Sequence, residues 1–238
     1  VLSSAQNDEI NWFENNGSQS FTKRTAVSSG LSGPWDIFAV DMDKDGDIDI
    51  LSGSSEGTKK VELHLNNGSQ SFTTSTVYTH SDGVKEVYGI DFDQDGDMDV
   101  FSRSDGAISW HENNGSQSFT NHNISTTVGN TGQSAVPIDL DRDGDIDIVT
   151  GDYNDGLLAW FDNNGSQSFT KKTISSDANI WSESHYYASD MDNDGDIDVV
   201  ATEYSSKLYW YKNNGSQAFT RLLVINAGSP NAVITSDI

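Results

Sequence analysis

Short apolar stretches alternate with polar, glycine-containing turns along the whole chain. In one representative part, alternating or β-branched residues predict strands at residues 37–40, 48–52, 61–65 and 72–77, because such runs bounded by turn residues are typical of strands. A polar turn at residues 54–58 separates the second of these strands from the third. We therefore expect four short antiparallel strands here.

The segment Asn-Asn-Gly-Ser-Gln joins the third and fourth expected strands. It occurs five times, with its first residue at Asn15, Asn66, Asn113, Asn163 and Asn213. Asn-Gly tolerates positive φ and favours a hairpin turn. Self-similarity at a period of about 50 residues indicates a repeat architecture, and four short antiparallel strands per repeat are typical of a propeller blade. The sequence therefore predicts an all-β fold, a β-propeller of four-stranded antiparallel blades.

A second repeated segment, Asp-x-Asp-x-Asp-Gly-Asp-x-Asp, joins the first and second expected strands. It occurs four times, starting at Asp41, Asp91, Asp139 and Asp190. Five carboxylates in nine residues repel one another unless a cation lies among them. Carboxylates at positions 1, 3 and 5 converge, glycine at position 6 permits a sharp turn, and position 7 offers its carbonyl. A carboxylate at position 9 completes an all-oxygen shell, which suits calcium.

The four loops predict about four Ca²⁺ sites. In the first loop we assign Asp41, Asp43, Asp45 and Asp49 as side-chain ligands and Asp47 as a carbonyl ligand. The complete set of predicted metal-binding residues is Asp41, Asp43, Asp45, Asp47, Asp49, Asp91, Asp93, Asp95, Asp97, Asp99, Asp139, Asp141, Asp143, Asp145, Asp147, Asp190, Asp192, Asp194, Asp196 and Asp198.

A solvated acidic turn and an EF-hand are the alternatives to this type of metal site, and both fit the acidic loops less well. A solvated turn would account for one such loop, but four copies in register favour a metal site. An EF-hand requires glutamate at position 12 of the loop. That position holds Ser52, Ser102, Thr150 and Ala201 in the four copies, and the flanking residues predict strands rather than helices.

The two ends of the chain match different parts of one repeat. Residues 12–16 match residues 160–164 of a third strand and its turn, whereas residues 232–237 match residues 134–139 of a first strand. We therefore expect residues 1–27 and 232–238 to form a composite blade that closes a five-bladed ring as one domain over residues 1–238. Such closure removes free sheet edges. In the alternative, the ends pair with another copy in an assembly formed by blade exchange.

Composition narrows the choice of partners and environment. The net charge is −24, and twenty of the 37 acidic residues lie in the four loops, so four calcium ions would leave about −16. Folding is therefore expected to depend on metal, and nucleic acid and anionic membranes are disfavoured as partners. Apolar residues make up 34% and aromatic residues 10%, the latter at fixed repeat positions, which argues against disorder.

The chain contains no cysteine, no apolar run long enough to span a membrane and no signal peptide, and it begins at Val1 rather than Met. This start indicates a processed product or an excised fragment. Because calcium is abundant outside cells, the acidic loops favour a secreted, extracellular location.

The Asp-x-Asp-x-Asp-Gly-Asp-x-Asp loop followed by an Ile-Asp-Ile/Val strand, repeated about every 50 residues, resembles the FG-GAP/VCBS repeat family. That family includes the calcium-binding blades of integrin α-subunit propellers and Psathyrella velutina-type propeller lectins. The resemblance covers essentially the whole chain. It implies a propeller with calcium in the loop between the first and second strands, and roles in adhesion, carbohydrate recognition or protein binding. Family members commonly have seven blades, so five repeats depart from the pattern.

Aromatic residues at repeated positions are expected to pack in the core. Trp12, Trp110, Trp160 and Trp210 share a third-strand position with Leu63, and a tryptophan that leucine replaces indicates packing between blades. Five phenylalanines follow the Asn-Asn-Gly-Ser-Gln turns and are also assigned to the core: Phe21, Phe72, Phe119, Phe169 and Phe219.

Residues that vary between repeats are better candidates for ligand contacts. An aromatic ring can support the apolar face of a sugar while nearby polar groups bind its hydroxyls. The candidates are Trp35, Asp36, Tyr153, Trp181, His185, Tyr186 and Tyr204, with His80 and Glu86 as further members of the variable set. In the alternative, each fills the central channel or covers a neighbouring blade.

The sequence does not support an enzyme. It has no cysteine nucleophile, and its five histidines lack metal-binding spacing. The leading hypothesis is a calcium-stabilised, multivalent carbohydrate-binding module whose partners are glycans. The alternatives are an adhesion propeller that binds a protein ligand, and a purely structural or engineered repeat scaffold.

Overall fold

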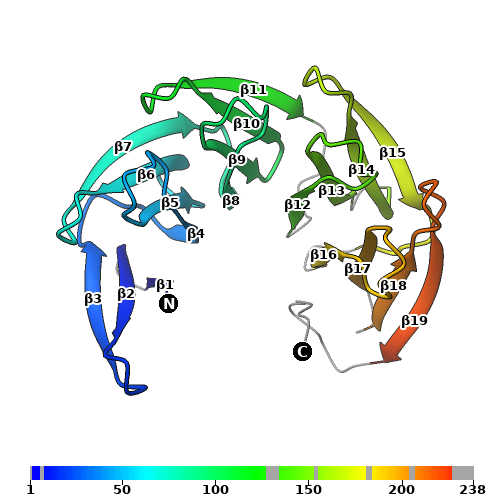
Figure 1. The fold of residues 1–238 in the computed structure, drawn as a ribbon, viewed down its shortest axis with the longest axis horizontal. Coiled ribbons are helices and arrows are strands. Elements are labelled where there is room, and N and C mark those ends of the chain that lie inside the picture. Colours follow the sequence, from blue (N-terminus) through cyan, green and yellow to red (C-terminus); the bar gives the residue numbers. More distant parts are fainter. Residues whose placement is uncertain are drawn as a thin grey trace. The chain divides into compact units, whose positions relative to one another are not determined.

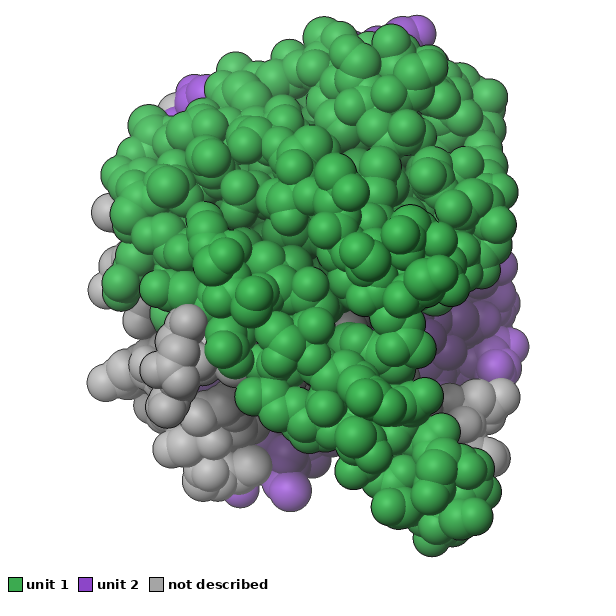
Figure 2. All heavy atoms as spheres, turned by 90° about the vertical axis from the view of Figure 1, so that its left-hand side faces the viewer, with its two compact units in different colours: residues 1–125 green, residues 126–238 purple. Residues whose placement is uncertain are grey.

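The computed structural model describes residues 2–5, for which only the backbone is described, and residues 8–126, 134–152, 155–180, 184–203 and 207–226. All regular elements in these ranges are β-strands, and none of the described residues form a helix able to cross a membrane. The strands make five antiparallel sheets (Figure 1). The chain divides into unit 1, residues 1–125, and unit 2, residues 126–238, which Figure 2 colours separately.

Unit 1 contains three sheets. The first consists of β1 (Leu2–Ala5), β2 (Glu9–Asn15) and β3 (Phe21–Val27). The second consists of β4 (Pro34–Val40), β5 (Asp49–Ser54), β6 (Lys60–Asn66) and β7 (Phe72–Thr79). The third consists of β8 (Val84–Ile90), β9 (Asp99–Ser104), β10 (Ile108–Asn113) and β11 (Phe119–Ser125). The second sheet confirms the four strands predicted over residues 37–77.

Unit 2 contains two sheets. One consists of β12 (Ala135–Ile138), β13 (Asp147–Asp152), β14 (Leu157–Asn163) and β15 (Phe169–Ser175). The other consists of β16 (Tyr186–Ser189), β17 (Asp198–Glu203), β18 (Lys207–Lys212) and β19 (Thr220–Asn226). Each of the four-stranded sheets is a simple antiparallel meander, as a propeller blade requires.

Among the described residues, the first sheet has three strands, which correspond to the second, third and fourth strands of a repeat. Strand β1 pairs with β2 from Leu2 opposite Trp12 to Ala5 opposite Glu9, and β2 pairs with β3. This confirms the strands predicted for the N-terminal end. Residues 232–238, predicted to supply the first strand of this sheet, lie outside the described residues, so the composite blade stays a prediction.

The Asn-Asn-Gly-Ser-Gln turns need two residues with left-handed backbone. In the turn between β6 and β7, Gly68 has φ +75° and Gln70 has φ +61°, and the other four turns share this arrangement. Asn67 stabilises the turn through its side chain, because its Oδ1 accepts the N–H groups of Ser69 (3.0 Å) and Ser71 (3.3 Å). The sequence predicts positive φ for the Asn-Gly pair of the turn, but it does not predict positive φ for the glutamine.

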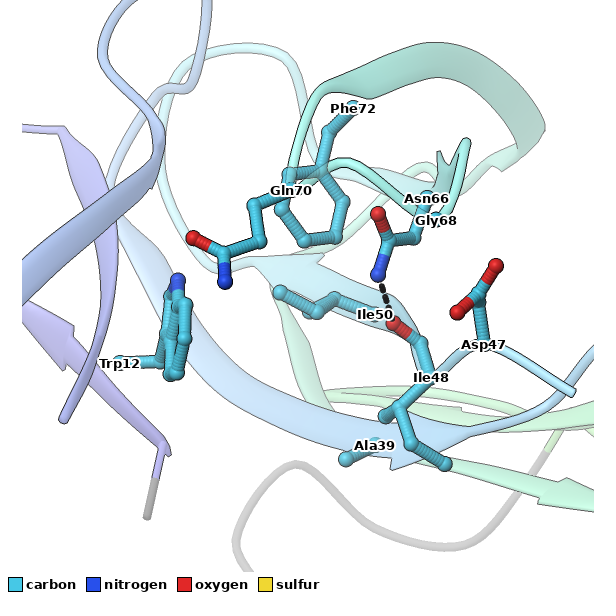
Figure 3. Close-up of a pocket in the computed structure, with 9 residues that line it drawn as sticks. All are labelled: Trp12, Ala39, Asp47, Ile48, Ile50, Asn66, Gly68, Gln70 and Phe72. Carbon is cyan, nitrogen blue, oxygen red and sulfur yellow. Dashed lines mark hydrogen bonds between the residues drawn. The ribbon is translucent and has the colours of Figure 1, made fainter. Parts of the chain in front are cut away.

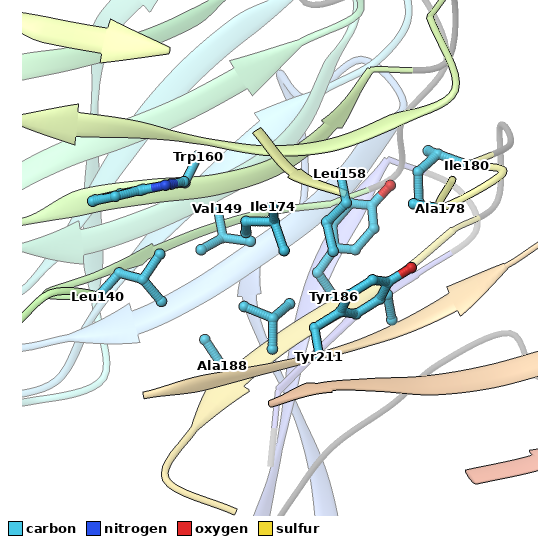
Figure 4. Close-up of a cluster of buried hydrophobic side chains, with 12 residues drawn as sticks. Leu140, Val149, Leu158, Trp160, Ile174, Ala178, Ile180, Tyr186, Ala188 and Tyr211 are labelled. Atoms are coloured by element: carbon cyan, nitrogen blue, oxygen red, sulfur yellow. The ribbon is translucent and has the colours of Figure 1, made fainter. Parts of the chain in front are cut away.

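The core lies between neighbouring sheets of each unit. Trp110, Trp160 and Leu63 are 2%, 1% and 0% exposed, which confirms that this third-strand position is a packing position. In unit 2, Trp160 packs in a cluster with Leu140, Tyr186 and Tyr211 (Figure 4). Tyr186 lies close above Gly151, where no side chain would fit between the two sheets.

The assignment of Phe21 to the core is wrong, since its side chain is 52% exposed. Its equivalents Phe72 and Phe119 pack against the apolar cluster of the preceding sheet. Phe21 begins the last strand of the first sheet, and the described residues of unit 1 form no sheet that precedes this one along the chain.

Candidate metal centres and ligand pocket

Each acidic loop lies between the first and second strands of a four-stranded sheet and is fixed by its ninth residue. In the second sheet, Asp49 is fully buried at the start of β5. Its Oδ2 accepts the N–H of Met42 (2.8 Å) and its Oδ1 accepts the N–H of Asn66 (2.7 Å). This carboxylate therefore joins the loop to the turn between β6 and β7.

The same arrangement recurs in the other three four-stranded sheets. Asp99, Asp147 and Asp198 each accept one N–H from the second loop residue and one from the first asparagine of the turn. The amide of that asparagine also donates to the carbonyl of the eighth loop residue, as Asn66 does to Ile48 at 3.2 Å. The acidic loop and the hairpin turn are thus one local structure.

Three acidic positions of each loop bring carboxylate oxygens together: positions 1, 3 and 5 in the first and fourth loops, and positions 1, 3 and 9 in the second and third. Three oxygens, one from each residue, lie within 4.8 Å of one another in the following groups: Asp41, Asp43 and Asp45; Asp91, Asp93 and Asp99; Asp139, Asp141 and Asp147; Asp190, Asp192 and Asp194. Two ligands of one calcium ion, each about 2.3–2.6 Å from it, lie up to about 5 Å apart. The groups could therefore hold a metal ion.

Three buried carboxylate oxygens without a hydrogen-bond partner among the described residues give stronger evidence that the loops fit a cation. The Oδ1 atoms of Asp41, Asp91 and Asp139 are buried and have no hydrogen-bond partner among the described residues. The second oxygen of each residue accepts the N–H of the loop glycine, for example Gly46 to Asp41 at 3.1 Å. A buried carboxylate oxygen without a partner is costly, and a coordinated cation removes that cost. These three loops fit a hard divalent cation.

Burial acts on the same carboxylates. It raises the pKa of Asp99 to about 7 and that of Asp147 to about 7. Burial first, and then neighbouring carboxylates, raises the pKa of Asp93 and of Asp141. The ionised form of each group is therefore disfavoured unless positive charge is nearby.

The seventh loop residue, whose carbonyl is a predicted metal ligand, also uses its side chain to pack on the hairpin turn. The carboxylate of Asp47 lies against Gly68 of the hairpin turn, and Asp97, Asp145 and Asp196 lie against the equivalent glycines. These side chains pack on the turn, so the loop and the turn have matching shapes.

A pocket of about 400 Å³ opens beside the first acidic loop in unit 1 (Figure 3). Trp12 from β2 of the first sheet forms one wall, and the second sheet supplies the remainder. The lining residues are Trp12, Ala39, Asp47, Ile48, Ile50, Asn66, Gly68, Gln70 and Phe72. An indole and aliphatic side chains therefore face two amides and a carboxylate.

The predicted ligand residues lie elsewhere. Trp35 is 53% exposed, with Lys85 Nζ 4.4 Å from its ring centre. Asp36 accepts the N–H of Val87 at 2.9 Å, and burial raises its pKa to about 6. These two residues are neighbours on β4 beside β8 of the third sheet.

The other five ligand candidates belong to unit 2. Tyr186 is 3% exposed and packs in the core, and the backbone of His185 pairs with Thr202. Tyr153, Trp181 and Tyr204 lie outside the described residues. Of the further candidates, His80 is buried and bonds Ser102 at 2.9 Å.

Sequence reasoning assigned Trp12 and Phe72 to the core and did not identify the pocket. The signal that would have identified the pocket is the second residue of the acidic loop, which packs against the third-strand tryptophan in other repeats. Phe92 stacks on Trp110 with ring centres 5.1 Å apart, and Leu140 packs in one cluster with Trp160. For Trp12, no equivalent loop residue occurs among the described residues, and the pocket lies at this position.

Antiparallel four-stranded sheets, each with an acidic loop after its first strand, define the chain as a propeller-type repeat protein. It belongs to the family of FG-GAP-like repeats, whose model matches residues 1–52, 41–102, 91–150, 139–201 and 190–238. Five matches and five sheets are consistent with the predicted five-bladed propeller.

A solved structure has the same class of fold. The chain is similar to an Agrocybe aegerita lectin described in terms of specific recognition of non-reducing terminal N-acetylglucosamine, with a TM-score of 0.66 and 20% identity. The match covers 92% of this chain and 61% of the lectin chain. A match to the Photorhabdus luminescens Tc holotoxin pore has a TM-score of 0.48 and 16% identity, over 92% of this chain and 11% of that one. The comparison with curated proteins finds no match.

Proposed function

We propose that the chain is a non-enzymatic, calcium-stabilised, carbohydrate-binding module, and that a sugar binds in the pocket beside Trp12. The composition of the pocket carries the proposal. Trp12 and Phe72 offer flat apolar surfaces, while Asn66 and Gln70 offer amide donors and acceptors. Sugars present both an apolar C–H face and hydroxyl groups, and sites for small polar ligands combine these two kinds of surface.

The size and position of the pocket support this proposal. About 400 Å³ lies within the usual range of roughly 300–1,000 Å³ for small-molecule sites. Asp47 belongs both to the pocket lining and to the first acidic loop, so a cation in that loop would fix one wall. Calcium would therefore act on sugar binding through the shape of the loop. A requirement for calcium also supports an extracellular location for the module.

Calorimetric titration against a glycan panel tests the proposal, with saturating calcium and again after chelation. N-acetylglucosamine-terminated glycans are the first probe, because a structurally similar lectin recognises that terminal sugar. We expect saturable binding that weakens on chelation. A folded, calcium-loaded chain that binds no glycan on the panel would refute the carbohydrate function, and a search for a protein ligand would then follow.

A further inference from the structure

The residue before each hairpin turn faces the acidic loop of its own sheet, and its chemistry differs between repeats. This position holds Leu65, Glu112, Asp162 and Lys212 in the four sheets that carry loops. Glu112 acts electrostatically on Asp93, and Asp162 acts on Asp141. Two loops thus face an additional carboxylate, which is itself paired with His122 in one case and with Lys172 in the other. One loop faces an apolar side chain, and only the fourth has a lysine at this position.

Lys212 binds the fourth acidic loop directly. Its ammonium group pairs with the carboxylate of Asp192 and lies 3.1 Å from Asp194 Oδ2. Arg142, from the preceding loop of the same unit, places Nη2 3.8 Å from Asp190 Oδ2. Each member of this carboxylate group therefore has a protein cation nearby, and the two cations carry the same total charge as one divalent ion.

The backbone of the fourth loop is also different. In the first three loops, the N–H of the fifth residue donates to Oδ1 of the third, as Asp45 does to Asp43 at 3.3 Å. In the fourth loop, the N–H of Asp194 instead donates to Asp190 Oδ1 at 3.1 Å. The oxygen that has no partner in the other three loops is therefore satisfied here within the protein.

We propose that Lys212 takes the place of a divalent cation in the fourth loop, so that the chain holds three calcium ions tightly rather than four. The inference rests on the proposed calcium binding of the first three loops. A calcium ion needs about six to eight oxygen ligands, and in the fourth loop two of the carboxylates are engaged by the ammonium group. An ion entering this loop must displace Lys212 and meets like charge from Arg142.

Counting bound ions tests the proposal. The chain is stripped with chelator and titrated with calcium alone against a chromophoric chelator, and native mass spectrometry counts the ions retained. We expect three tight sites. Four equivalent tight sites would overturn the inference and leave calcium binding intact, whereas no tight site would refute calcium binding itself.

Matched variants identify the loop. Lys212→Leu introduces the residue found at this position beside the first loop, Leu65, and Lys212→Glu introduces the one beside the second loop, Glu112. Both substitutions should raise the number of tightly bound calcium ions from three to four. Glu112→Lys makes the reverse exchange and should lower the count from three to two. Circular dichroism checks that each variant is folded. A count of three in all folded variants would overturn the proposal, because the residue before the turn would then have no influence on occupancy.

Discussion

Asp47 Oδ2 lies 2.5 Å from the position that a Cβ atom on Gly68 would occupy. Gly68 belongs to the hairpin turn and Asp47 to the acidic loop, and the equivalent pairs approach closely in the other three sheets that carry loops. Glycine therefore serves the turn in two ways, through its positive φ and through the absence of a side chain facing the loop. The two repeated segments of the sequence are parts of one structural feature.

Gly68→Ala should destabilise the protein more than Gly17→Ala. Both positions have left-handed backbone, with φ +75° and φ +80°, so both substitutions cost about 1 kcal/mol from backbone strain. Only at Gly68 does the new methyl group also meet a carboxylate, which adds roughly 1–3 kcal/mol. Urea denaturation in saturating calcium measures the difference.

Gly17 is a matched control because nothing lies within 4 Å of its added Cβ atom. Equal losses in the two variants would contradict the packing of Asp47 on the turn. Equal losses would also mean that backbone strain alone governs these positions.

Chelation of calcium should lower the melting temperature. The chain carries a net charge of −24, and three of its acidic loops contain buried carboxylate oxygens that have no partner among the described residues. Each occupied site adds about 2.7 kcal/mol to the free energy of unfolding when free calcium is 100 times the dissociation constant. Differential scanning fluorimetry across a calcium series measures the shift.

Sodium chloride at matched ionic strength is the control for general charge screening. If sodium chloride raised the melting temperature as much as calcium does, the loops would act only as a diffuse acidic surface. Magnesium gives a second comparison, since it demands a stricter octahedral geometry than calcium.

Trp12→Leu should weaken glycan binding by roughly tenfold or more, because loss of an aromatic contact removes about 1.5 kcal/mol. Leucine is the natural residue at the equivalent position Leu63, so the sheet should remain folded. Trp35→Ala, at an exposed tryptophan outside the pocket, is the comparison. If only Trp35→Ala reduced binding, the site would lie on β4 near Asp36, as the variable residues of the sequence suggest.

Acidification should destabilise the chain through its buried histidines. Burial lowers the pKa of His64 to about 4 from 6.5, so the unfolded chain takes up a proton below pH 6.5 that the folded chain does not. This contribution to stability is present above pH 6.5 and decreases as the pH falls toward 4. Between pH 7 and pH 5 it amounts to about 2 kcal/mol.

His64→Phe tests this contribution, since phenylalanine occupies the equivalent positions Phe13 and Phe161. The variant should lose about 2 kcal/mol less stability than the wild type over the same pH change. Identical pH dependence in His64→Phe and the wild type would show that His64 is protonated in the folded state.

The fold was predictable because its determinants are local and repeated. The alternation of residues 37–77, the Asn-Gly turns and the acidic loops each specify a strand end or a turn without reference to distant residues. The five repetitions then indicated the number of sheets. The positive φ of Gln70 escaped prediction, because glutamine has no intrinsic preference for left-handed backbone and is held there by the turn.

The ligand candidates were harder to place because variability does not show which way a side chain points. Tyr186 varies between repeats, yet it lies in the core over Gly151. Trp12 is repeated, yet it lines a pocket, since this depends on what its neighbours leave uncovered. The contact of Lys212 with the fourth loop requires knowledge that the residue before the turn faces that loop, which the repeat alignment alone does not give.

The hydrogen bonds between loop and turn also bear on the order of folding events. They join residues only 14 to 18 positions apart, from Asn113 with Asp99 to Asn66 with Ile48. Contacts this close in sequence close short loops and form early, whereas packing between sheets links more distant residues. Each of the four repeats that carry a loop can thus begin to fold independently, and nucleation at several points along the chain is the behaviour expected of a repeat protein.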